Sequence, residues 1–222
     1  MTKTALFAVL LSATPAFLAG AGLLAGNAWA DAAAPVIDNA RVTVRDIHIK
    51  KGETAPVISH AGDYVVLYVN GGRTRSTDNK TAPHVAGSAM AGQGGATADT
   101  ALDADVHEVV VELKNAPSNT VPNNTGLPPA FPREGSKLVL ETPQVRVWNY
   151  AWAPGKPTPM HFHNTEVVVT YLHDGDVSST TPDGKTQVNH RKAGDIVFNV
   201  ANRSHSEALV KGEQAGIMLE LK

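Results

Sequence analysis

Short stretches of alternating apolar and polar residues recur along this chain and predict β-strands. Three stretches alternate regularly, at residues 41–49, 137–141 and 145–149. Three further stretches are short apolar runs bounded by turn residues, at residues 63–69, 107–113 and 166–172. No segment keeps the 3.6-residue apolar period of a long helix. The pattern therefore predicts an all-β protein built from short strands.

The chain also resembles itself when it is shifted by about 103 residues. The matched segments are 41–52 over 144–155, 63–68 over 166–171, and Gly72 over Gly175. Chance similarity between two ordinary β segments is the alternative explanation. Glycines, a proline and strand ends match in the same order, however, and this favours a duplication. We expect two copies of one β unit.

The predicted organisation has four parts. Residues 31–115 form a first β domain and residues 137–222 form a second. Between them, residues 116–136 are rich in Pro, Asn and Ser, which is typical of a linker. Residues 1–30 precede the folded chain and are interpreted separately.

Residues 1–30 have the features of a secretory signal peptide. Lys3 supplies a positive charge, an apolar stretch runs over residues 5–24, and Ala-Trp-Ala at 28–30 resembles a cleavage site before Asp31. An uncleaved anchor is the alternative, and Pro15 argues against it. We therefore expect a periplasmic or secreted protein that has no membrane contact after cleavage.

Composition narrows the classes of partner. The 222 residues carry 19 Lys and Arg against 21 Asp and Glu, a net charge of −2, which gives nucleic acid no basic surface to bind. There is no cysteine, so no disulfide holds the exported chain together. Its core must suffice, helped by a metal or by association into a homo-oligomer. A small-molecule ligand is the expected partner.

The most specific chemistry in the sequence is the histidine pair after a Gly/Pro-rich turn. His161 and His163 follow Gly155 and are separated by one residue. In a strand, residues i and i+2 point to the same face, so both imidazoles can enter one pocket. Two converging imidazoles favour a divalent metal.

The second half resembles the cupin family. Two sets of residues carry the family's motif spacing: Gly155, His161, His163 and Gly175 for the first motif, and Gly194 and His205 for the second. The resemblance implies an all-β chain of two double-stranded β-barrel (jelly-roll) units. It also implies metal ligation by His161, His163 and His205.

The chain departs from the family pattern at the fourth ligand. The family's glutamate would fall at Val167 or Val168, both apolar. Glu166 is one residue early, and a one-residue shift turns a side chain to the other face unless a bulge intervenes. Glu207, two residues after His205, is the other candidate for a fourth ligand or proton carrier. The fourth ligand therefore stays open between the two.

The first half lacks the histidine pair. Ile58 occupies the position that matches His161, and only His60 remains, at the position that matches His163. One imidazole does not hold a metal, so this half is predicted to be a degenerate, structural copy.

Two functions follow as hypotheses. The first is a metal-dependent enzyme, an oxygenase by analogy with the family, that binds Fe, Mn, Zn, Ni or Cu and a small organic molecule. Lys156, Arg191 and Arg203 flank the motif and could hold a substrate carboxylate, although a solvated rim is the favoured interpretation of each. The second is a non-catalytic periplasmic binding or structural module without metal. Val200 and Asn202, in place of the family's Pro and Gly, favour it.

Overall fold

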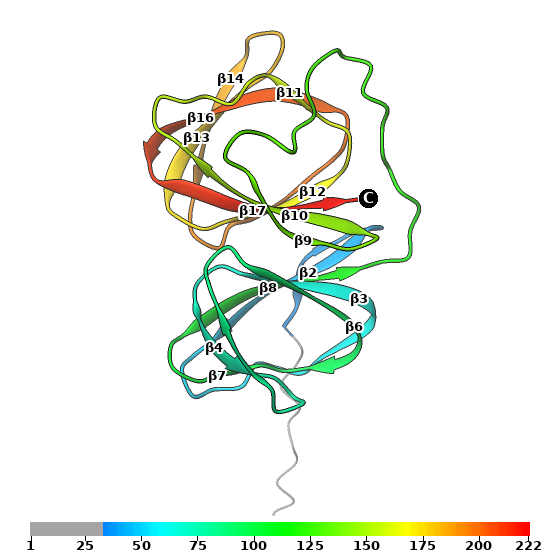
Figure 1. Ribbon diagram of the computed structural model, residues 1–222, viewed down its shortest axis with the longest axis vertical. Helices are drawn as coiled ribbons and strands as arrows, with labels where there is room; N and C mark the ends of the chain where they lie inside the picture. The colour runs from blue at the N-terminus through cyan, green and yellow to red at the C-terminus, as the bar shows by residue number, and fades with distance from the viewer. Residues whose placement is uncertain (1–32) are drawn as a thin grey trace, which may run out of the picture.

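The computed structural model describes residues 33–222, which form two β-barrels that meet at a narrow waist (Figure 1). The signal-peptide prediction for residues 1–30 lies outside this part of the chain. Within residues 33–222 the chain is all strand and loop, and no helix is long and apolar enough to cross a membrane. The prediction of an all-β, jelly-roll fold is confirmed.

The first barrel contains two antiparallel sheets. Its strands are β1 (Pro35–Asp38), β2 (Val42–Ile49), β3 (Ile58–Tyr68), β4 (Gly72–Arg75), β5 (Thr81–His84), β6 (Ala89–Thr97), β7 (Thr100–Ala101) and β8 (Val106–Leu113). One sheet has the order β1-β2-β8-β3-β6, and the other has the order β5-β4-β7.

The second barrel repeats this plan. Its strands are β9 (Lys137–Glu141), β10 (Val145–Trp152), β11 (His161–His163), β12 (Val167–Tyr171), β13 (Gly175–Thr180), β14 (Thr186–Arg191), β15 (Ile196–Asn199), β16 (Arg203–Gly212) and β17 (Gln214–Leu221). The sheets have the orders β9-β10-β17-β12-β15 and β11-β16-β13-β14. The two five-stranded sheets thus have equivalent strand orders, which is what a duplicated unit would produce.

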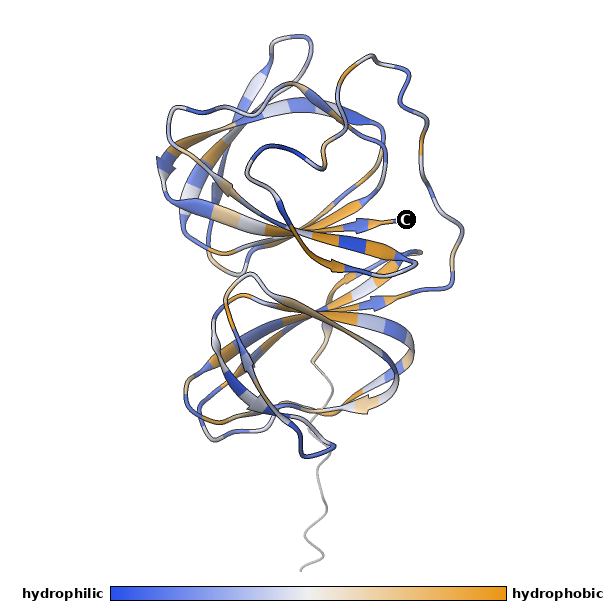
Figure 2. Ribbon diagram, in the orientation of Figure 1, coloured by the Kyte–Doolittle hydropathy of each residue, from blue (hydrophilic) through white to orange (hydrophobic). Residues whose placement is uncertain are grey.

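The two five-stranded sheets share one apolar core between the barrels. It combines Val44 and Val111 of the first barrel with Val147, Val168 and other residues of the second. Figure 2 shows the apolar strand segments concentrated at this waist. Each barrel also has its own apolar interior, so these sheets are covered on both faces. This explains the unbroken apolar runs in the sequence, because a strand buried on both faces need not alternate.

The segment 116–136, predicted as a linker, packs along the second barrel (Figure 1). The Phe162 N–H donates to the Pro128 carbonyl at 2.9 Å, and the Ala130 N–H donates to the Phe162 carbonyl at 2.9 Å. Val121 is tied to Asn164 in the same way, at 2.8 Å. The segment therefore extends the sheet beyond β11 and carries its own side chains to the histidines.

Candidate metal centre

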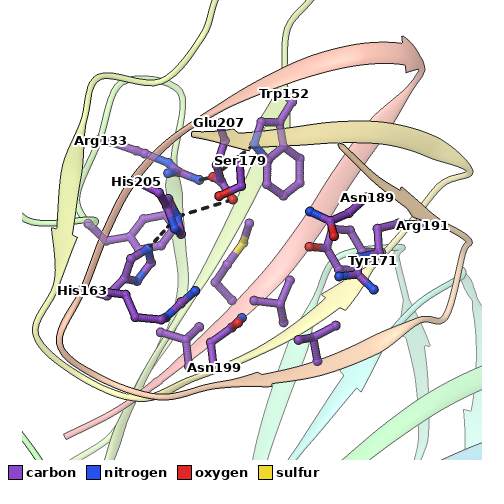
Figure 3. A pocket seen from close by; sticks show the side chains of 16 residues that line it. Arg133, Trp152, His163, Tyr171, Ser179, Asn189, Arg191, Asn199, His205 and Glu207 are labelled. Atoms are coloured by element: carbon purple, nitrogen blue, oxygen red, sulfur yellow. Dashed lines mark hydrogen bonds and ion pairs between the residues drawn. The ribbon is translucent and has the colours of Figure 1, made fainter. Parts of the chain in front are cut away.

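Three histidines meet in the interior of the second barrel. His161 and His163 lie on β11, and His205 pairs directly with His161 from β16. The Nε2 atom of His163 lies 3.2 Å from Nε2 of His161 and 3.3 Å from Nε2 of His205. All three side chains are buried. The structure thus brings together the three ligands expected from the sequence, two of which are labelled in Figure 3.

The spacing of these nitrogens fits a single metal ion. Bonds of about 2.1 Å to one ion place two nitrogens roughly 3.0 Å apart at a right angle and roughly 3.4 Å apart at the tetrahedral angle. The observed 3.2 and 3.3 Å lie between these values. The Nδ1–H of His161 donates to the Pro159 carbonyl at 2.8 Å, which puts the ring's lone pair on Nε2, where Arg133 Nη1 lies at 3.4 Å. Three such nitrogens suit a divalent first-row metal.

The charge state of the histidines also suits a metal. Burial lowers the pKa of all three imidazoles, and it brings the pKa of His205 to about 4. Neighbouring positive charges, such as that of Arg203, lower these pKa values further. The rings are therefore neutral at pH 7, and neutral imidazole is the form that binds a metal.

This charge state predicts an acid-sensitive metal-free protein. The pKa of His205 is about 4 in the folded chain, against an ordinary value of 6.5 that the unfolded chain retains, so between these values only the unfolded chain binds a proton there. Stability is therefore lost as the pH falls through this interval, by on the order of 2–3 kcal/mol for His205. Urea unfolding in EDTA at pH 7, 5.5 and 4 measures the effect. A wild-type profile no steeper than that of His205→Asn would contradict it.

Glu207 lies beside the cluster without joining it. Its Oε1 is 3.7 Å from His205 Nε2, too far for a hydrogen bond. Its Oε2 accepts hydrogen bonds from Arg133 at 3.3 Å and from the Trp152 indole at 3.2 Å (Figure 3). Burial raises the pKa of Glu207, but the Arg133 charge and the hydrogen bond from Trp152 lower it, and the pKa stays below its ordinary value. Glu207 is therefore a carboxylate held at the edge of the site.

Glu166, the other candidate for the fourth ligand, is directed elsewhere, and this corrects the expectation from the sequence. Its carboxylate forms an ion pair with Arg41 Nε at 3.1 Å and accepts a hydrogen bond from Asn119 at 3.0 Å. Glu166 is outside the group of metal-type ligands formed by the three histidines. It precedes β12 and shares a face with Val168, which packs in the core between the barrels. Alternation along the strand, without a compensating bulge, gives Glu166 a structural role.

A cavity of about 100 Å³, lined by His163 and His205, opens into the barrel. Arg191 and Arg203 line it, which corrects their interpretation as a solvated rim, whereas Lys156 lines a separate depression. The Arg191 guanidinium lies over the Tyr171 ring, 5.3 Å from its centre. Figure 3 shows Arg191 and Tyr171 across the cavity from His163 and His205. The cavity therefore has the imidazoles of His163 and His205 at one end and the Arg191 guanidinium at the other.

Two further cavity residues escaped the sequence reasoning. Arg133 comes from the supposed linker, and its guanidinium lies 3.9 Å from the centre of the Tyr150 ring. Trp152 lines the cavity, and its indole N–H donates to Glu207. No local pattern marks Arg133, because its position depends on the pairing of residues 128–130 with β11.

The first barrel has no counterpart to this cluster among its described residues. Ile58 is buried in its apolar interior, and His60 Nε2 is hydrogen-bonded to the Thr97 hydroxyl at 2.8 Å. A separate group, Asp46, His48 and His107, has ligand atoms close together. The two rings are stacked, however, with centres 3.9 Å apart, and both imidazoles pair with the Asp46 carboxylate, at 2.6 Å for His107 and 3.4 Å for His48. Nothing in this arrangement matches the three converging nitrogens of the second barrel.

Comparison with known proteins identifies the architecture through structure alone. No family model matches the chain, and no curated protein matches its sequence. A cupin 2 conserved barrel domain protein from Leptotrichia buccalis superposes with a TM-score of 0.54 and 16% identity, over 85% of this chain and 87% of that one. The protein Ylba from E. coli gives 0.58 and 12%, over 82% and 77%. Oxalate decarboxylase from Bacillus subtilis, described with Mn(II) centres, gives 0.55 and 12%, over 83% and 69%.

Proposed function

The chain has the two-barrel cupin fold, and on this premise we propose that its second barrel is a metal-dependent site for a small organic acid. One observation carries the proposal. Three neutral imidazole nitrogens converge beside a cavity that three guanidinium groups line, with Arg191 across from His163 and His205. A metal ion and a carboxylate can therefore be bound next to each other.

The charge inventory of the cavity supports an anionic ligand. Its charged lining consists of three arginines and one glutamate: Arg133, Arg191, Arg203 and Glu207. Because the imidazoles are neutral, the lining has a net positive charge that favours anions. A guanidinium recognises a carboxylate through two parallel N–H donors. The volume of about 100 Å³ limits the ligand to a small molecule.

His161, His163 and His205 would hold the ion, with Fe, Mn, Zn, Ni and Cu as the candidates that imidazole ligands suit. When bound, such an ion supplies Lewis-acid or redox chemistry to a substrate beside it. The manganese of the oxalate decarboxylase structures supports Mn among these candidates. An oxidoreductase or oxygenase reaction is the class that we propose.

The remaining lining residues have separable roles. Arg191 lies over Tyr171, and its buried Nε has no hydrogen-bond partner among residues 33–222, so it can donate to a substrate oxygen. Arg203 is anchored by its own Nε, which donates to the Val200 carbonyl at 2.9 Å. Its terminal nitrogens remain available to a carboxylate. Val167 and Val169 form an apolar wall that keeps water from the ligand.

Glu207 is the residue that we propose moves a proton. Its Oε2 is held by Arg133 and Trp152, while Oε1 faces His205 at 3.7 Å. The lowered pKa keeps Glu207 ionised at neutral pH, so it can accept a proton from a bound acid or from water.

Replacing Arg191 by glutamine is expected to weaken carboxylate binding roughly 10- to 100-fold, because a charge-assisted pair is lost. Calorimetric titration of the Mn²⁺-loaded protein with oxalate, formate and acetate measures this, and the metal content should not change. Lys156→Gln is the matched control, since Lys156 lies outside the cavity. Equal affinities in the wild type and Arg191→Gln, or binding of acetamide as tight as acetate, would refute an anion site.

A non-catalytic binding module is the second candidate, and the position of Glu166 favours it. The Glu166 carboxylate pairs with Arg41, so the group of three histidines contains no carboxylate ligand. This candidate predicts the same metal and carboxylate binding without turnover. Oxygen consumption and product analysis on the same panel of acids distinguish the two.

We also propose that the protein is exported. The sequence of residues 1–30, with its apolar stretch and Ala-Trp-Ala end, is the support. Mass analysis of the protein from the native host should give a chain that begins at Asp31. An intact chain that begins at Met1 would refute cleavage.

A further inference from the structure

The interior of the first barrel contains a second cavity, of about 70 Å³, whose lining includes none of the three histidines of the second barrel. Apolar residues form most of its wall, including Ile58, Val66 and Val110. Two carboxyl groups interrupt this wall, those of Asp99 and Glu108. No role described above uses either group.

Glu108 is the unusual member of this wall. Its side chain projects inward from β8 and is only 4% exposed. Its Oε1 receives no hydrogen bond from any residue between 33 and 222. Burial first, and then the neighbouring Asp99, raise the pKa of Glu108 to about 8. At neutral pH this pKa keeps Glu108 mostly protonated, and its Oε1 still has no donor among residues 33–222. A buried oxygen without a donor is costly, so a ligand explains Glu108 better than packing does.

The surroundings of Glu108 supply no cation of their own. The cavity wall contains neither lysine nor arginine. The two nearby histidines are engaged elsewhere: His60 bonds to Thr97 and stacks on Tyr64, and His84 bonds to Thr74 and stacks on Tyr68. The cavity therefore offers carboxyl oxygens as acceptors and no cationic side chain, and its own donors are the hydroxyl groups of Tyr64, Ser76 and Thr97.

We propose that the first barrel binds a small primary ammonium compound in this cavity. The ammonium group donates hydrogen bonds to Glu108 and Asp99, and a short alkyl chain packs against Ile58, Val66 and Val110. A bare divalent cation fits less well. Such ions need three or more protein ligands in a closed site, and Glu108 and Asp99 belong to no such group in the described chain.

Size and access set the limits of the ligand. A cavity of about 70 Å³ admits a molecule of only a few non-hydrogen atoms. Met90, on the edge strand β6, lines the cavity and is 42% exposed, so it marks the entrance. Methylammonium, ethylammonium and propylammonium are the ions that match these limits.

The proposal is tested by calorimetric titration of the full chain with these three ammonium chlorides, with sodium chloride as the matched salt. We expect saturable binding to the wild type and a roughly 10- to 100-fold weaker affinity in Glu108→Gln. Glu112→Gln is the control, because Glu112 lies on the same strand and pairs with Arg45 at 3.2 Å, outside the cavity. Circular dichroism shows whether each variant folds, and Asp99→Asn serves if Glu108→Gln does not.

Three outcomes would overturn the proposal. The first is the absence of saturable binding to the wild type at 50 mM, roughly the weakest affinity worth assigning to a site. The second is equal affinity in the wild type and in a folded variant at Glu108 or Asp99. The third is that methanol, ethanol and propanol bind as tightly as the ammonium ions, which would mean that the charge of the ligand does not contribute to binding. None of these outcomes depends on the metal site of the second barrel.

Discussion

Replacing His163 by alanine is expected to weaken Mn²⁺ binding by more than about 100-fold, beyond the usual effect of altering a residue that only supports a ligand. The Nε2 atom of His163 lies within 3.3 Å of those of both His161 and His205. Its loss leaves a metal ion with only two imidazole ligands. Titration against a fluorescent chelator, followed by metal analysis of the dialysed protein, measures the change.

His190→Ala is the matched control for this prediction. His190 is exposed on β14 and pairs with Asp176 at 2.6 Å, outside the cavity. We expect its removal to leave Mn²⁺ affinity unchanged. If His163→Ala folds and keeps the affinity of the wild type, the three histidines are not the metal site.

Replacing Glu166 by alanine is expected to lower the free energy of unfolding by about 3–5 kcal/mol, because it leaves a buried arginine without its carboxylate. Both side chains of the Arg41–Glu166 pair are 9% exposed. Arg41 also donates to the carbonyls of Ala116 and Lys222, at 3.0 and 3.1 Å, so it ties together segments that flank the strands of both barrels. Guanidinium unfolding, followed by tryptophan fluorescence, measures the loss.

The same variant tests the corrected role of Glu166. Since its carboxylate faces Arg41 and Asn119, we expect Glu166→Ala to bind Mn²⁺ as tightly as the wild type does. Glu141→Ala is the control for stability, because Glu141 pairs with Arg146 and Lys222 at the surface, and such pairs contribute far less than a buried pair. Loss of metal from a stable Glu166→Ala protein would restore Glu166 as a ligand.

The histidine site could be predicted because short-range rules determine it. The i, i+2 spacing puts His161 and His163 on one face of a strand, and the structure keeps them there. His205 followed from the spacing of the second motif, and the pairing of β11 with β16 brings it opposite His161. The all-β fold followed from strand-like patterns in both halves.

The positions of the Arg133 and Glu166 side chains could not be predicted from local sequence patterns. Arg133 enters the site because backbone hydrogen bonds hold residues 128–130 against β11, and a Pro-rich composition does not reveal that pairing. Glu166 depends on where β12 begins after the turn that follows His163. The strand starts at Val167, whose side chain faces the barrel interior, so Glu166 faces the other barrel. A sequence gives the period of a strand more readily than its phase relative to a turn.

Anomalous diffraction from crystals grown with Mn²⁺ tests the central claim most directly. We predict one strong peak per chain, about 2.1 Å or slightly more from Nε2 of His161, His163 and His205. The site formed by Asp46, His48 and His107 should give no comparable peak. A strong peak at that second site, or none at the three histidines in protein that retains one ion per chain in solution, would contradict the account.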